Sequence, residues 1–137
     1  MQAQLIISSR NRPDFLVTAI HSALNQTVPF SRIIVSDNSS KNPEQQALMA
    51  AVAKQFACHR SVLIMATNKE LSAHDHFKFI QRTYIPDDDS LSIVFHDDDE
   101  LLPNFHNTII ETFDTTPNLS AVSCNAKILN NNGVRKF

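Results

Sequence analysis

Short apolar runs alternate along the chain with longer amphipathic segments. The apolar runs are typical of buried strands, and we expect strands at residues 4–8, 32–36, 61–66, 91–95 and 119–124. The amphipathic segments repeat their apolar residues about every four positions, so we expect helices at residues 13–24, 43–56, 72–83 and 103–113. This alternation predicts an α/β fold in which helices sandwich a mainly parallel sheet.

Local signals support the helix starts. Pro13 suits the first turn of the first helix, and Ser72 suits the N-cap of the third. The inward faces of the first three helices are expected to include Phe15, Leu16, Leu48, Phe77 and Ile80.

The end of the chain carries a hairpin signal. Asn132-Gly133, between Ile128 and Val134, is typical of a two-residue β-turn. No repeat or linker interrupts the sequence, so we expect residues 1–137 to form a single domain. The chain stops as the second arm of the hairpin begins, so we expect the domain to be truncated on its C-terminal side. The strands then missing would leave residues 119–128 as an exposed apolar edge, which favours self-association into a homo-oligomer.

Composition narrows the classes of partner. A net charge of −2 and a pI near 6.3, without a basic run, give no reason to expect nucleic acid. No apolar stretch approaches the ~20 residues of a membrane span, and no signal peptide is visible. We therefore expect a cytoplasmic protein, with Cys58 and Cys124 buried and reduced.

The chain contains one glycine, Gly133. Dinucleotide folds and phosphate loops use several glycines to bring backbone amides against phosphates, so neither is expected. A nucleotide bound here would need its phosphates neutralised in another way.

Two runs of three aspartates flank the fourth predicted strand, Asp87 to Asp89 before it and Asp97 to Asp99 after it. The strand between them spans roughly 20 Å, at about 3.3 Å per residue, so the runs lie at opposite edges of the sheet. Ligands of open α/β sheets bind beyond the carboxyl ends of the strands. The first run is thus interpreted as a solvated turn. The second lies where a site is expected, and its adjacent carboxylates are tolerated best with a bound divalent cation, although a plain acidic loop is the alternative.

Other polar residues close neighbouring strands. Asp37 ends the second strand, and Ser8 and Ser9 end the first, so the same rule brings them to the same crevice. Residues 37–40 also suit a simple turn. The histidines show no zinc-binding spacing and are interpreted as surface or packing residues, among them His74, His76, His96 and His106.

Taken together, these segments resemble family 2 glycosyltransferases with the GT-A (Rossmann-like) fold. The resemblance covers nearly the whole chain in the family's order, in segments 7–27 (ISSRNRPDFLVTAIHSALNQT), 32–40 (RIIVSDNSS), 68–79 and 92–105 (SIVFHDDDELLPNF). The acidic motif in the last segment is the most diagnostic. The usual proline-threonine-tyrosine after the first strand is Ser8-Ser9-Arg10 here, and a glycine often found near Asp37 is Ser39.

The resemblance implies site residues. Those implied to contact the nucleotide are Ser8, Ser9, Arg12, Asp37, Asn68 and Asp97, and those implied to bind Mn²⁺ or Mg²⁺ are Asp98 and Asp99. Counting back from Pro103 favours Asp97 for the ribose and Asp98 for the metal that bridges the diphosphate. A simple aspartate-x-aspartate motif would instead use Asp97 and Asp99.

The resemblance also implies the reaction. Such enzymes transfer a sugar, with inversion, from a nucleoside diphosphate sugar to an acceptor hydroxyl. For this chain it implies a UDP-sugar donor and a saccharide or lipid-linked acceptor, in polysaccharide or glycoconjugate biosynthesis. The catalytic base of the family would lie beyond Phe137, so no catalytic residue is expected in this chain, and we expect the chain alone to be inactive. Two alternatives are a non-catalytic nucleotide- or metal-binding module, such as a degenerate partner subunit, and a metal-dependent phosphohydrolase.

Overall fold

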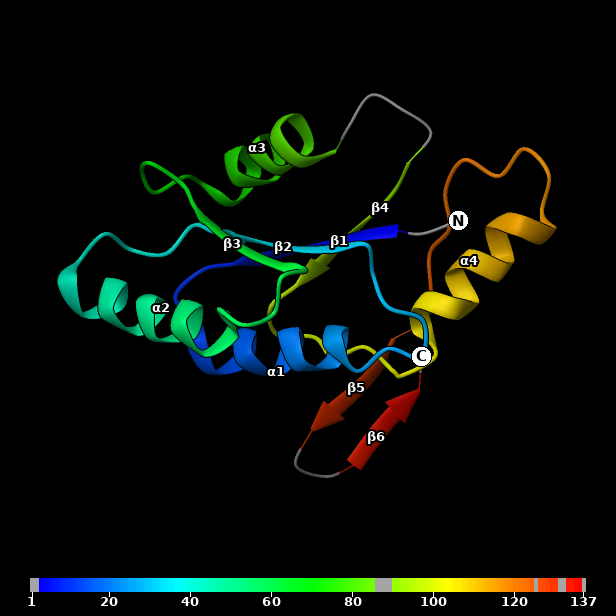
Figure 1. Ribbon diagram of the computed structural model, residues 1–137, viewed down its shortest axis with the longest axis horizontal. Helices are drawn as coiled ribbons and strands as arrows, with labels where there is room; N and C mark the ends of the chain where they lie inside the picture. Colours follow the sequence, from blue (N-terminus) through cyan, green and yellow to red (C-terminus); the bar gives the residue numbers. More distant parts are fainter. Residues whose placement is uncertain (1–2, 86–89, 125, 131–132, 137) are drawn as a thin grey trace.

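The computed structural model of the protein describes residues 3–85, 90–124, 126–130 and 133–136. Strands and helices alternate through most of the chain (Figure 1). The strands are β1 (Ala3–Ser9), β2 (Arg32–Asp37), β3 (Val62–Ala66), β4 (Leu91–His96), β5 (Lys127–Asn130) and β6 (Gly133–Lys136). The helices are α1 (Pro13–Leu24), α2 (Pro43–Phe56), α3 (Ala73–Tyr84) and α4 (Phe105–Thr115).

The first four strands form one parallel sheet in the order β3-β2-β1-β4. In its register Ser9 lies opposite Asp37 on β2, and Ser8 lies opposite His96 on β4. The carboxyl ends of these strands therefore meet at one edge. The structure confirms the predicted α/β class with a parallel sheet.

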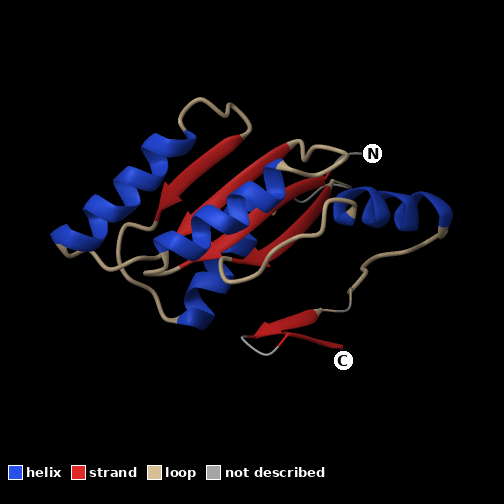
Figure 2. Cartoon of the chain, turned by 90° about the horizontal axis from the view of Figure 1, so that it is seen from below, coloured by secondary structure: helices blue, strands red, loops and turns tan. Residues whose placement is uncertain are grey.

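Helices cover both faces of the sheet. Helices α1 and α2 lie on one face and α3 lies on the other (Figures 1 and 2). Alternate residues of the central strands point to opposite faces, so Leu5 and Ile7 join the core under α1 and α2, whereas Ile6 packs against Ile80 of α3. Burial of each such side chain stabilises the fold by about 1.5–3 kcal/mol.

Both predicted helix starts are confirmed. Pro13 occupies the first turn of α1. Ser72 caps α3, and its hydroxyl accepts the Asp75 N–H at 3.1 Å. The structure adds a cap for α2, where the side chain of Asn42 accepts the Gln45 N–H at 2.8 Å.

Three helix residues predicted to face inward are exposed, with Phe15 at 58%, Leu48 at 44% and Phe77 at 48% of full exposure. Each is adjacent in sequence to the residue that is buried, and one position on a helix is a turn of about 100°. In α3 the buried residue is His76, one helical turn before Ile80. A polar side chain takes this core position because the strands below it present the hydroxyls of Ser8 and Ser36.

Residues 119–124 form no strand, so the fifth predicted strand is wrong. Val122 is exposed in this segment. The apolar pattern predicted a strand here, but such a pattern does not show whether a neighbouring strand is present to pair with it. The predicted hairpin is confirmed as β5 and β6, which pair antiparallel with Asn130 opposite Gly133. Its loop, including Asn132, lies outside the described residues, as do Asp87 to Asp89. Cys58 and Cys124 are both exposed rather than buried.

Helix α4 is tied to the amino end of β1 through His106, which is fully buried. Its Nδ1 donates to the carbonyl of Val28 at 2.8 Å, so its Nε2 accepts the Ala3 N–H at 3.2 Å. The ring also stacks on Phe30 with a centroid distance of 4.1 Å. His106 is thus a packing residue, as the sequence predicted.

Candidate functional site

The polar ends of β1, β2 and β4 are joined by backbone hydrogen bonds at the carboxyl edge of the sheet. The Asp97 N–H donates to the carbonyl of Ser8 at 3.1 Å, and the Asn38 N–H donates to that of Ser9 at 2.9 Å. Neighbouring strands lie about 4.8 Å apart, so Asp37 and Asp97, on the two sides of β1, are about 10 Å apart. One ligand can therefore reach both residues.

Asp97 is buried and anchors the end of β1. Its Oδ2 accepts the Ser9 hydroxyl at 2.9 Å and the Arg10 N–H at 3.2 Å. Its Oδ1 lies 3.5 Å from the Arg12 guanidinium. Since the Ser9 hydroxyl is buried and donates to Asp97, both side chains hold the strand ends together.

Arg12 makes its shortest contact with Asp98, at 2.6 Å from Nη1 to Oδ2. The chain turns sharply just before it, because Asn11 has a positive φ of 55°. The Asn11 N–H donates to the hydroxyl of Ser39, and its side-chain oxygen accepts the Ser40 N–H. This turn brings the Arg12 guanidinium to the acidic run.

Asp37 keeps one oxygen for a ligand. Its Oδ1 accepts the Ser39 N–H at 2.9 Å, and none of the described residues hydrogen-bonds its Oδ2. Asp37 is buried, at 2% of full exposure, and Oδ2 is not among the described side-chain atoms that are fully buried without a partner, so only a small part of this oxygen faces solvent. This oxygen can accept an N–H or O–H from a bound molecule.

Asn38 is a site residue that the sequence did not reveal, because residues 37–40 suited a simple turn. Its Oδ1 accepts the Leu71 N–H at 2.8 Å and the Thr67 hydroxyl at 3.2 Å, and its Nδ2 donates to the Leu71 carbonyl at 2.9 Å. It fastens the segment between β3 and α3 to the end of β2. Asn68 lies in that segment at the same edge, where it is exposed and makes no hydrogen bond to the other described site residues.

Ser8 points to the opposite face of the sheet from Asp37, toward α3. His76 lies between two strands there, with Nε2 2.9 Å from the Ser36 hydroxyl and Nδ1 3.4 Å from the Ser8 hydroxyl. Burial is the main cause of the lowered pKa of His76. The negative charge of Asp37 raises this pKa, and the positive charge of Arg10 lowers it further. The ring is therefore neutral at pH 7, and one nitrogen donates while the other accepts.

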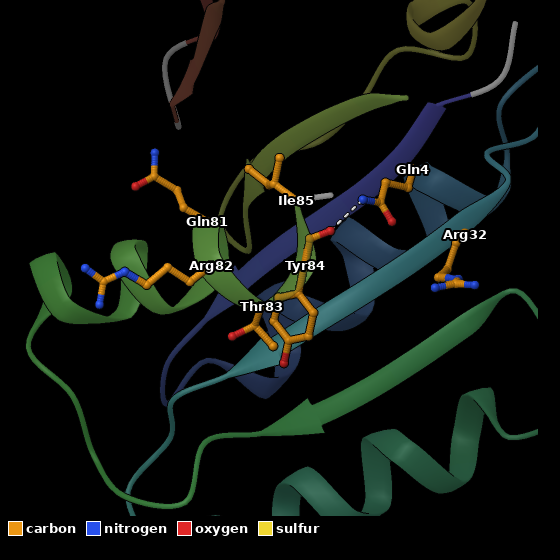
Figure 3. A pocket seen from close by; sticks show the side chains of 7 residues that line it. All are labelled: Gln4, Arg32, Gln81, Arg82, Thr83, Tyr84 and Ile85. Atoms are coloured by element: carbon orange, nitrogen blue, oxygen red, sulfur yellow. Dashed lines mark hydrogen bonds between the residues drawn. The ribbon is translucent and has the colours of Figure 1, made fainter. Parts of the chain in front are cut away.

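An open cavity of about 690 Å³ lies at the other end of the strands (Figure 3). Its lining comes from the start of β1 and β2 and the end of α3, namely Gln4, Arg32, Gln81, Arg82, Thr83, Tyr84 and Ile85. Burial raises the pKa of Tyr84, and a hydrogen bond with Ser36 partly offsets this by lowering the pKa. In Figure 3 the side chains of Gln81 and Arg82 point away from Tyr84, so the polar groups do not converge. The cavity contains none of the predicted site residues.

The comparison with protein families decides the identity. The family model described as "Glycosyl transferase family 2" matches residues 4–136. The chain belongs to glycosyl transferase family 2. This membership confirms the resemblance found in the sequence.

Solved structures agree on the fold. The chain superposes on "S. aureus TarS" with a TM-score of 0.61 and 12% identity, over 83% of this chain and 20% of that one. It superposes on "S. aureus TarS 1-349" with a TM-score of 0.63 and 13% identity, over 83% of this chain and 32% of that one. The family 2 chain thus spans a third or less of these two proteins. The search of curated proteins gave no match. Among the described residues, no helix is long and apolar enough to cross a membrane.

The acidic loop of this family 2 domain suits a cation that is coordinated partly by the protein and partly by a bound substrate. Asp98 and Asp99 are exposed side by side, while the described residues include no group of three histidines, cysteines or carboxylates that could hold a metal. Mg²⁺ binds through one or two carboxylates plus substrate phosphates and water, so this donor set suits it without a preformed cage. The loop is fixed on both sides, by Asp97 and by Leu101, whose N–H donates to the Ser22 hydroxyl at 3.1 Å.

Proposed function

We propose that this domain binds a nucleoside diphosphate sugar, with UDP as the nucleotide, at the carboxyl edge of the sheet. The observation that carries the proposal is the convergence there of Asp37, whose Oδ2 accepts no hydrogen bond from the described residues, and the Arg12–Asp98 pair, on the two sides of β1. Such an edge is the usual ligand site of an open α/β sheet.

Each residue has a role in the proposal. Asp37 accepts an N–H of the base, and Asn68 lies along the nucleoside. The Ser8 hydroxyl faces His76 on the other side of the sheet, so Ser8 serves the nucleotide site through its backbone carbonyl, which holds Asp97 at the end of β1. Asp97 positions β1 and contacts the ribose, with Ser9 as its partner. Asp98 and Asp99 hold Mn²⁺ or Mg²⁺, which when bound neutralises the diphosphate and stabilises it as a leaving group.

The proposed reaction is the transfer of the sugar to a hydroxyl of a saccharide or lipid-linked acceptor with inversion. The acceptor oxygen bonds to the anomeric carbon as the bond from that carbon to the phosphate oxygen breaks on the opposite face. A general base takes the acceptor proton, and the nucleoside diphosphate leaves. Family membership and the carboxyl-edge geometry support this proposal.

A melting-temperature series tests the proposed function. We expect UDP with Mn²⁺ to raise the Tm, because a ligand that binds only the folded state stabilises it. GDP, TDP and CMP, each with and without Mn²⁺, are the comparisons. A larger shift with GDP or TDP would contradict uracil as the base, and no shift with any of the nucleotides would contradict donor binding.

A further inference from the structure

Arg12 lies at one of the two carboxylate oxygens through which Asp98 could bind a cation. The guanidinium lies 2.6 Å from Asp98 Oδ2, and a divalent cation binds a carboxylate oxygen at about 2.0–2.6 Å. The two cannot contact that oxygen from the same side. Even a few ångströms away, the positive charge of Arg12 would repel a divalent ion.

The other nearby arginine is directed elsewhere. Arg10 lies 3.3 Å from the carboxylate of Glu70 and donates to the Leu71 carbonyl at 3.1 Å. Its charge is thus neutralised on the segment between β3 and α3, away from Asp98. Among the described residues, Arg12 is the cationic side chain paired with the acidic run.

The Arg12–Asp98 pair is strong enough to be formed and weak enough to be exchanged. Both side chains are half exposed, at 49% and 47%, and an exposed ion pair is weak because water screens its charges. A diphosphate offers arginine a better partner, because phosphate oxygens accept two parallel N–H bonds from a guanidinium. Arg12 can therefore leave Asp98 when a diphosphate arrives.

We propose that Arg12 is a built-in counter-cation that keeps Asp98 closed to divalent metal until a nucleoside diphosphate draws the guanidinium onto its phosphates. This inference rests on the proposed function and adds to it the reason why metal and nucleotide bind together. It makes Arg12 a phosphate-binding residue that couples the two ligands.

The test is a titration of Mn²⁺ alone, followed by Mn²⁺ in the presence of UDP, into wild type and Arg12→Gln. Removal of one positive charge next to the ion should tighten binding of Mn²⁺ alone by about tenfold. UDP should raise the affinity for Mn²⁺ by a smaller factor in the variant, because the variant has no guanidinium at Asp98 for the diphosphate to draw away. Arg10→Gln is the matched control, and we expect its affinity for Mn²⁺ alone to equal that of wild type.

Arg12→Lys tests whether the effect of Arg12→Gln comes from the lost charge or from a disturbed fold. It keeps the positive charge, so its affinity for Mn²⁺ alone should stay near that of wild type. Equal affinities of wild type and Arg12→Gln for Mn²⁺ alone, with UDP-dependent Mn²⁺ binding intact in wild type, would overturn the inference and leave the proposed function standing. A wild type that binds neither UDP nor Mn²⁺ under any of these conditions would overturn both.

Discussion

Asp98→Asn should abolish the metal-dependent part of nucleoside diphosphate binding and leave the fold unchanged. An amide has the shape of the carboxylate but no charge, so it is a poor ligand for a hard cation. The fold should survive, because the Asp98 side chain is half exposed and its ion pair with Arg12 is a weak surface contact. Calorimetric titration of UDP, with and without Mn²⁺, should show that Mn²⁺ no longer raises the affinity of the variant for UDP.

Two further variants serve as a control for this result and as a test of the motif register. Glu100→Gln removes an exposed carboxylate from the same loop and should bind UDP and Mn²⁺ as wild type does. Asp99→Asn tests the register of the motif. A loss seen in Asp99→Asn and absent from Asp98→Asn would show that the metal ligands follow the aspartate-x-aspartate spacing, and equal affinities of wild type and Asp98→Asn would remove Asp98 from the site.

Asp97→Ala should lower the stability of the fold. Asp97 is buried, and its carboxylate accepts the hydroxyl of Ser9 and the backbone N–H of Arg10. Without it, these two donors at the end of β1 lose their acceptor, and each such loss costs about 1–3 kcal/mol. Urea unfolding should therefore show a loss of about 2–6 kcal/mol in the free energy of unfolding with an unchanged m-value.

Asp99→Ala is the matched control for stability, because this aspartate is exposed two residues away in the same loop. It should change the free energy of unfolding by less than about 0.5 kcal/mol. Should Asp97→Ala prove as stable as Asp99→Ala, the contacts of Asp97 would not hold the ends of β1 and β4 together.

Much of the fold follows from periodicity in the sequence. The first four strands and the four helices lie where the apolar pattern predicted them, within two residues at each end. Pro13 and Ser72 marked helix starts through local chemistry, which needs no tertiary information. The segment 119–124 was predicted wrongly for the converse reason, since an apolar run becomes a strand only with a partner beside it.

The location of the site could be predicted from the sequence, but most of its side-chain contacts could not. The rule that ligands bind beyond the carboxyl ends of parallel strands brought Asp37 and Asp97 to one edge, as the structure has them. The contacts of Asp97 with Ser9, of Asn38 with Leu71 and of His76 with Ser36 join segments far apart in the chain. Such pairs depend on how the elements pack, which hydrophobic patterning does not specify.

The central claim is that nucleotide and metal meet at the carboxyl edge of the sheet, and paramagnetic broadening of backbone amide NMR signals by Mn²⁺ in the presence of UDP tests it most directly. Gln4 lies about 16 Å along β1 from Ser9, at about 3.3 Å per residue, so the two edges are well resolved. We predict that the amide signals of Arg10 and of Asp97 to Asp99 broaden first, while those of Gln4 and Arg32 beside the cavity persist. Broadening centred on Gln4 and Arg32, with the signals of Asp97 to Asp99 unchanged, would contradict the claim.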